Sequence, residues 1–164
     1  MANCWAADKA GHMQLTSTAF SEGAPIPARH ACDADNVSPL LKWSGVPAEA
    51  KSLVLIADDP DAPVGTWVHW VLYDLPASPG ELAEDVPKSQ YLPSGAKQGI
   101  NDFKRLGYGG PCPPAGKPHR YFFKLYALDK QLDLKPGATK KAVEGAMEKH
   151  VLAQAQLMGT YKRQ

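Results

Sequence analysis

The sequence predicts a mainly β domain, an antiparallel β-sandwich that ends in a single α-helix. Short runs rich in β-branched and aromatic residues alternate along the chain with segments that form turns. The 15 prolines and 14 glycines are spread over the 164 residues, which indicates many turns between short elements rather than one linker. Apolar residues recur with a helical spacing only near the C-terminus. This combination favours two packed sheets with one terminal helix.

Five strands are predicted. In chain order they cover QLTSTAF from residue 14, LLKW from residue 40, SLVLIAD at 52–58, WVHWVLYD at 67–74 and RYFFKLYAL at 120–128. Two of the intervening loops are rich in polar residues and proline, DDPDAPVGT at 58–66 and NDFKRLGYGGPCPPAGKP at 101–118. The second loop is long for a compact domain, and long ordered loops are often functional.

The terminal helix is predicted from about Thr139 to Leu157. Val143, Met147 and Val151 recur at four-residue steps, which places them on one helix face. Gly159 is interpreted as the residue that stops the helix. The apolar stripe is interpreted as part of the core, with the interface of a homodimer as the alternative.

Length and charge indicate one domain without a strongly charged partner. A single domain is assigned to residues 13–164, near the common domain size of about 100–150 residues. Gly11, His12 and Met13 look like sequence left by cloning, so residues 1–12 are interpreted as a tag or a flexible N-terminal extension. The formal net charge of +1 gives no reason to expect nucleic acid or an anionic membrane as partner. Because no run of about 18 apolar residues exists, no transmembrane segment is expected.

The three cysteines, Cys4, Cys32 and Cys112, form neither a C-x-x-C pair nor a zinc-binding spacing. An odd count without a signal peptide favours a reducing compartment. The cytoplasm is therefore predicted, or the periplasm where a signal peptide has been removed. Cys32 and Cys112 both lie in predicted loops, so a disulfide between them remains open. Cys112 is also the one candidate nucleophile, although an inert thiol or a disulfide is the favoured interpretation.

Two predicted strands begin with a histidine in line with large apolar residues. Strand alternation places Trp67, His69, Val71 and Tyr73 on one face, and His119, Tyr121, Phe123 and Leu125 on another. A histidine on an apolar face is usually a core residue, but the proline-stiffened turn DDPDAP can hold a carboxylate beside one. Histidines, a tyrosine hydroxyl and a glycine-rich backbone then supply N–H and O–H donors that converge on an anion.

These motifs resemble the phosphatidylethanolamine-binding protein family, in particular its bacterial and archaeal Raf-kinase-inhibitor-like branch. The matching segments are DPDAP at 59–63, WVHW at 67–70, GGPCPPAGKPHRY at 109–121, CDADNVSPLLKW at 32–43 and LAQAQLMGTYKR at 152–163, the last of which is matched to a closing helix. The resemblance implies a two-sheet antiparallel β-sandwich with a few short peripheral helices. It also implies a small cavity at one end of the sandwich that takes phosphate-like anions.

The resemblance implies a binding protein rather than an enzyme, with no catalytic residue, no metal and no cofactor. The implied ligand-binding residues are Asp59, His69, Gly110, Pro114, His119 and Tyr121. The implied ligand is a phosphate or a phospholipid headgroup such as that of phosphatidylethanolamine. Modulation of a partner kinase or protease is a further implied role, with the partner itself unknown. Asp61 is expected to brace the turn, and Arg120 to be structural.

One alternative from a different class of protein stays open, a metal-dependent enzyme. Asp59, His69 and His119 make two histidines and a carboxylate, which is the ligand set of non-haem iron sites. A role in protein interaction alone, with the cavity as a regulatory site, is the other alternative.

Overall fold

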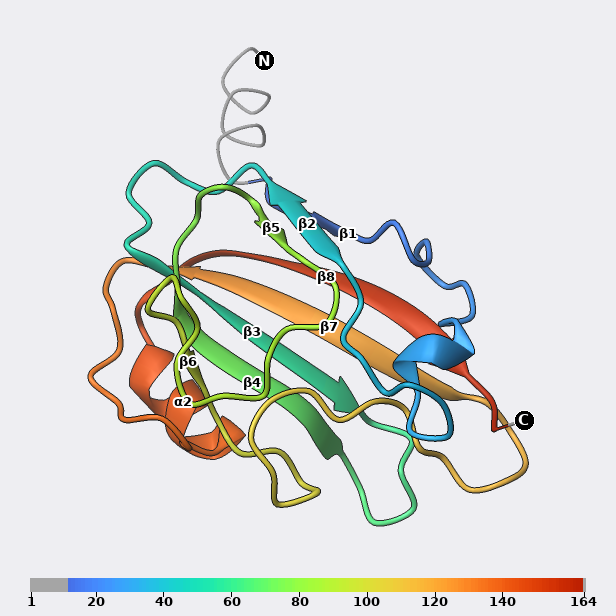
Figure 1. Cartoon of the computed structure of the whole chain (residues 1–164). Coiled ribbons are helices and arrows are strands. Elements are labelled where there is room, and N and C mark those ends of the chain that lie inside the picture. The colour runs from blue at the N-terminus through green and yellow to red at the C-terminus, as the bar shows by residue number, and fades with distance from the viewer. Residues whose placement is uncertain (1–11, 164) are drawn as a thin grey trace.

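The computed structural model describes residues 12–163 and shows a β-sandwich with one α-helix (Figure 1). The elements are β1 (Gln14–Thr16), the 3₁₀ helix η1 (Ala28–His30), β2 (Leu41–Ser44), β3 (Ser52–Asp59), β4 (Trp67–Leu75), β5 (Glu81–Leu82), β6 (Lys97–Gln98), β7 (His119–Leu128), α2 (Lys140–Met147) and β8 (Val151–Tyr161). The predicted fold class is confirmed, and each of the five predicted strands is present near its predicted bounds.

The strands form two antiparallel sheets. The small sheet has the order β1-β2-β5 and the large sheet the order β6-β4-β3-β7-β8. Figure 1 shows the small sheet over one face of the large sheet, with α2 against the other face. The long pairing of β7 with β8 runs from Leu128 and Val151 to His119 and Tyr161, so the start of β7 lies beside the end of β8.

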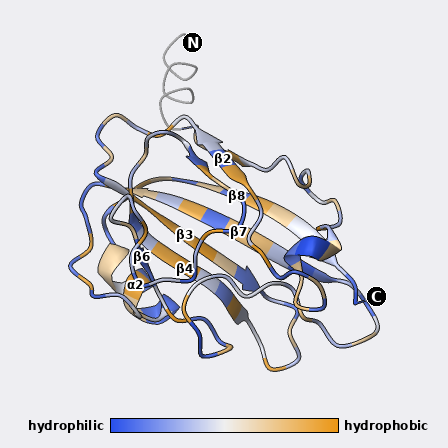
Figure 2. Cartoon of the chain, viewed as in Figure 1, coloured by the Kyte–Doolittle hydropathy of each residue, from blue (hydrophilic) through white to orange (hydrophobic). Residues whose placement is uncertain are grey.

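Strand β3 is buried on both faces, which explains its unbroken apolar run. Leu53 and Leu55 pack into the core between the sheets, whereas Val54 and Ile56 pack toward α2. Figure 2 shows hydrophobic residues concentrated on β3 and β4, with a change to hydrophilic residues at the end of β3. This buried centre fixes the positions from which the loops at that end depart.

Strand β4 contains a bulge at its histidine. Consecutive residues of β3 pair with Val68 and Trp70, which leaves His69 as the extra residue between them. The prediction that His69 shares a face with Val71 and Tyr73 is therefore wrong, because those two side chains pack toward α2 together with Val68. The predicted common face of β7 is confirmed, since Tyr121, Phe123 and Leu125 all belong to the core between the sheets.

The predicted long C-terminal helix is half right. Helix α2 starts at Lys140, where the Thr139 hydroxyl accepts a hydrogen bond from the Ala142 N–H, but it ends at Met147. Residues 151–161 form strand β8, although the sequence favours a helix there. Ten residues of β8 pair with β7, and such pairing outweighs the helical propensity of alanine, glutamine and leucine, which favour helices on their own.

Gly159 therefore lies inside a strand and does not stop a helix. A Cβ atom at this position would lie 2.6 Å from Ile26 Cγ1 and 2.7 Å from Phe20 Cε2, so a bare backbone is needed for close packing.

Two sequence predictions concern the ends and the membrane. The interpretation of residues 1–12 falls almost wholly outside the described residues. Within residues 12–163 no helix has the length and apolar character that crossing a membrane requires.

Candidate functional site

A cavity of about 230 Å³ is lined by residues of the β3–β4 loop and of the long loop before β7. Five of the six predicted ligand-binding residues line it, namely Asp59, His69, Pro114, His119 and Tyr121. We call it the histidine cavity. Gly110 instead lines a neighbouring cavity, and its N–H donates to Asn36 Oδ1 at 2.8 Å, so the structure does not bring it together with the other five.

Asp59 holds His119 in a fixed orientation. The Nδ1 atom of His119 lies 2.7 Å from Asp59 Oδ2, and the other carboxylate oxygen accepts the Asp61 N–H at 2.7 Å. The side chain of Asp59 is only 4% exposed and that of His119 only 12% exposed. A carboxylate with both oxygens occupied orients the imidazole and leaves Nε2 as the ring nitrogen available to a ligand.

His69 is oriented by the backbone of the long loop. Its Nδ1 atom lies 2.6 Å from the carbonyl oxygen of Gly109, which can only accept, so Nδ1 carries the proton. Burial is the main cause that lowers the pKa of His69, against smaller opposing effects from the Gly109 carbonyl and the Asp59 charge. A neutral His69 in this tautomer offers Nε2 as a hydrogen-bond acceptor.

Tyr121 stands between the two histidines. Its ring meets His69 edge-on at 5.2 Å and is stacked with His119 at 6.5 Å between ring centroids. Its hydroxyl is buried and makes no hydrogen bond of ordinary length and angle among residues 12–163, although the Cys112 backbone and the Asp59 carboxylate lie close to it. Burial, followed by the nearby charge of Asp59, raises the pKa of Tyr121, so the hydroxyl keeps its proton and remains a donor.

The rest of the cavity wall is mostly apolar and was not named by sequence reasoning. Trp67 and Phe103 pack edge to face at 5.5 Å, and Val64, at the outer part of the β3–β4 loop, is 81% exposed. Ala62, Pro63, Cys112 and Pro113 complete the lining. The two polar loops were recognised as functional candidates, but only the folded chain shows which of their apolar residues face inward.

A disulfide between Cys32 and Cys112 ties the long loop to the segment after η1, across 80 residues of sequence. The Cys32 N–H also donates to the Pro111 carbonyl at 2.9 Å, and Arg163 Nε donates to the Pro113 carbonyl at 2.8 Å. The question that the sequence left open is thus answered. Because disulfides persist mainly in oxidising compartments, the cysteine count no longer favours the cytoplasm.

The β3–β4 loop is fastened to β7 by a second polar contact. Arg120 donates to the Asp61 carboxylate through its backbone N–H, Nε and Nη2, at 3.0, 3.0 and 2.9 Å. These hydrogen bonds are the main cause that lowers the pKa of Asp61 to about 2. Asp61 and Arg120 therefore have the bracing and structural roles expected of them.

The structure gives no support to the metal-dependent alternative. Among residues 12–163 there is no group of three histidine, cysteine, aspartate or glutamate side chains arranged to hold a metal ion. Asp59 and His119 bond to each other instead, and His69 uses Nδ1 on a carbonyl. Cys112, the candidate nucleophile, has no free thiol because it is oxidised.

Comparison with known proteins identifies relatives along nearly the whole chain. The family model described as phosphatidylethanolamine-binding protein matches residues 16–162. A UPF0098 protein of Methanothermobacter thermautotrophicus is 56% identical over 151 residues, which are 92% of this chain and 99% of that protein. A UPF0098 protein of Aquifex aeolicus is 54% identical over 153 residues, which are 92% of this chain and 89% of that protein.

Two solved structures share the fold. A homologue of phosphatidylethanolamine-binding protein from Chlamydia trachomatis has a TM-score of 0.85 at 45% identity, covering 94% of this chain and 99% of that one. YbcL of E. coli, described as a new member of the mammalian PEBP family, has a TM-score of 0.86 at 35% identity, covering 93% of this chain and 99% of that one. The family model covers all the segments on which the sequence resemblance rests, except the last residue of the final segment, Arg163.

Proposed function

The chain belongs to the phosphatidylethanolamine-binding protein family, and we propose that its histidine cavity binds the phosphate group of small phosphate-bearing molecules, phospholipid headgroups among them. The observation that carries this proposal is the buried Tyr121 hydroxyl, which makes no hydrogen bond of ordinary geometry within the described residues. A buried donor that is left unsatisfied costs about 1–3 kcal/mol. A ligand oxygen that accepts from this hydroxyl recovers that energy.

The other polar groups suit a phosphate that carries one proton or an amine. Neutral His69 offers an acceptor at Nε2, which favours a P–OH group or an ammonium group opposite it. Asp59 accepts hydrogen bonds from His119 and Asp61, so the group it presents to a ligand is the His119 ring that it orients. A phosphate monoester of ethanolamine presents acceptors and donors in the required mixture.

The size of the cavity supports a small ligand. Its volume of about 230 Å³ lies below the ~300–1,000 Å³ of pockets that enclose drug-sized molecules. It has room for a headgroup rather than for acyl chains.

We further propose that binding, without catalysis, is the function of the site. The disulfide removes the thiol that sequence reasoning offered as a nucleophile. Modulation of a partner kinase or protease, dimer formation and the cellular compartment stay predictions.

The test is a calorimetric titration with inorganic phosphate, phosphoethanolamine and ethanolamine. The substitution Tyr121→Phe removes only the hydroxyl and is expected to weaken phosphate and phosphoethanolamine binding about tenfold or more, since a hydrogen bond to a charged group is worth about 1.5–3 kcal/mol. His119→Ala is expected to weaken the binding of both ligands more than Tyr121→Phe does. Ethanolamine alone is expected not to bind.

The matched control is His150→Ala. His150 Nδ1 lies 2.8 Å from Asp129 Oδ1, so this variant breaks a similar histidine–aspartate pair outside the cavity. It should leave the affinity for phosphate unchanged. Phosphate binding that is equally strong in wild type and Tyr121→Phe would contradict the proposed contact, and absence of saturable binding in wild type would contradict the proposed function.

A further inference from the structure

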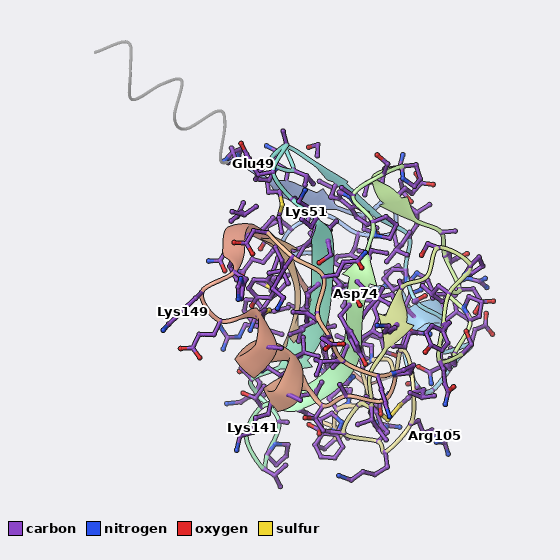
Figure 3. The ribbon with its side chains drawn as sticks, turned by 90° about the vertical axis from the view of Figure 1, so that its left-hand side faces the viewer. Glu49, Lys51, Asp74, Arg105, Lys141 and Lys149 are labelled. Carbon is purple, nitrogen blue, oxygen red and sulfur yellow. A yellow bond between two sulfur atoms is a disulfide. The ribbon has the colours of Figure 1, made fainter. Side chains whose placement is uncertain are left out.

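A second cavity, of about 330 Å³, lies on the other side of Phe103 and Cys112, which line both cavities. Lys88 and Arg105 supply its charged side chains, and Tyr108 is among its apolar walls. We call it the basic cavity. Figure 3 shows Arg105 among the loops on the side of the sheet opposite α2.

The two cations of this cavity are not neutralised. Neither Lys88 Nζ nor the Arg105 guanidinium makes an ion pair or a hydrogen bond within residues 12–163, and no acidic residue lines the cavity. Other cations of the same molecule are paired, as Arg120 is with Asp61 and Lys97 with Asp74. Two unpaired positive charges at one hollow attract an anion from solution.

Asn36 adds a neutral donor. Its Oδ1 accepts the Gly110 N–H at 2.8 Å, which fixes the orientation of the amide and leaves Nδ2 as a donor. Asn101 has a different role, because its Oδ1 accepts the Phe103 and Arg105 N–H groups and its Nδ2 donates to the Gly107 carbonyl. Asn101 therefore shapes the turn that carries Phe103 and Arg105.

The inner wall of the basic cavity is apolar. Tyr108 is buried, and its hydroxyl already donates to the His30 carbonyl at 2.7 Å, so the cavity meets mainly its ring. Phe103, Leu106 and the disulfide extend this surface. An apolar inner wall together with the exposed cationic side chains of Lys88 and Arg105 fits a ligand with an apolar body and one anionic group.

We propose that the basic cavity is a second binding site, which takes small organic anions with an aromatic or aliphatic body. The anionic group contacts Lys88, Arg105 and Asn36 Nδ2, and the apolar body packs against Phe103 and Tyr108.

The test uses benzenesulfonate, a small aromatic anion that stays ionised at all pH values near neutral. We expect saturable shifts in the amide NMR signals of Lys88, Asn101, Gly107 and Gly109 in the whole, oxidised chain. Arg105→Gln and Lys88→Gln are each expected to weaken binding about tenfold or more, as for the loss of one hydrogen bond to a charged group. Uncharged benzenesulfonamide is expected to bind more weakly than benzenesulfonate.

The matched control is Lys104→Gln, which removes the same charge one residue away from Arg105 but outside the cavity lining. This variant is expected to change the affinity less than about twofold, because an exposed charge outside the site is screened by salt. Equal weakening by all three variants would overturn the proposal in favour of diffuse charge attraction. Shifts centred on Trp67 and His69, or no saturable shift at all, would overturn it as well.

Discussion

The histidine cavity and the basic cavity share Phe103 and Cys112 but hold their polar groups in opposite ways. In the histidine cavity each imidazole is fixed through Nδ1, by Asp59 for His119 and by Gly109 for His69. In the basic cavity the charged ends of the cations have no partner among the described residues. One site is organised before a ligand arrives, whereas the other is organised by the ligand.

This difference separates two sources of affinity. A prearranged site loses little side-chain entropy on binding and selects its ligand by geometry. Long cationic side chains lose more rotamer freedom, but they attract any anion that approaches and depend on ionic strength. We therefore expect the histidine cavity to be the more selective of the two, and the basic cavity to be the more sensitive to salt.

The largest effect is expected from the disulfide, because Cys112 is common to both cavities. Reduction of the Cys32–Cys112 bond opens a loop of 80 residues and is expected to lower the free energy of unfolding by about 2–5 kcal/mol. It is also expected to weaken both phosphate and benzenesulfonate binding. Denaturant unfolding and titrations of the oxidised and reduced protein measure these changes.

The control for this experiment is the Cys4→Ser background, in which reduction changes only the Cys32–Cys112 pair. The two cavities are then compared by which of the two affinities, for phosphate or for benzenesulfonate, falls on reduction. If reduction weakened the binding of only one of the two ligands, Cys112 would support only one cavity and would not act as a wall common to both. Equal unfolding free energies in both redox states would contradict the stabilising role of the disulfide.

The predictability of these two sites from sequence differs for a physical reason. Asp59, His69, His119 and Tyr121 belong to short motifs, so the sequence marks them directly. Lys88 and Arg105 come from separate loops and look like ordinary surface cations, and only folding places them at one hollow.

Two features of the fold were also beyond sequence periodicity. The bulge at His69 is an extra residue in pairing with β3, which alternation within β4 alone does not reveal. Strand β8 contains residues that favour a helix, and its extended form comes from pairing with β7. Both errors arise where contacts distant in sequence decide the local structure, while the buried run of β3 was predicted correctly.

An intermediate effect is expected from pH, and it belongs to the histidine cavity alone. The pKa of His69 is lowered from its ordinary value of 6.5 by burial, so the unfolded chain binds this proton more readily than the folded chain does. The contribution of neutral His69 to the free energy of unfolding is therefore fully present above about pH 6.5. It decreases as pH falls from there toward the lowered pKa. Urea unfolding between pH 7.5 and pH 5 measures the slope.

His69→Gln is expected to reduce this slope, whereas Arg105→Gln, in the basic cavity, is expected to leave it as in wild type. His150→Gln is the control for removing a histidine that is partly exposed, with 37% of its side chain accessible. A slope that persists unchanged in His69→Gln would show that another group causes the acid sensitivity.

The smallest effect is expected from the Asp61–Arg120 pair, which holds the β3–β4 loop at the histidine cavity only. The side chains are 31% and 52% exposed, so screening limits their contribution to stability to less than about 1 kcal/mol. Since the pKa of Asp61 is lowered from 3.8 to about 2, this contribution is present above about pH 4 and is lost as pH falls toward 2. Arg120→Gln is expected to lose it at every pH.

Calorimetry of Arg120→Gln then tests how far the loop alone prepares the histidine cavity. Phosphate affinity is expected to fall less than about fivefold, since the lost pair is worth under about 1 kcal/mol, and benzenesulfonate affinity is expected not to change. Asp59 and His119 belong to paired strands, so they stay in place when the loop gains freedom. A loss of phosphate affinity beyond about tenfold would mean that Val64 and its neighbours in the loop enclose the ligand, and that the site is completed by the loop rather than by the strands.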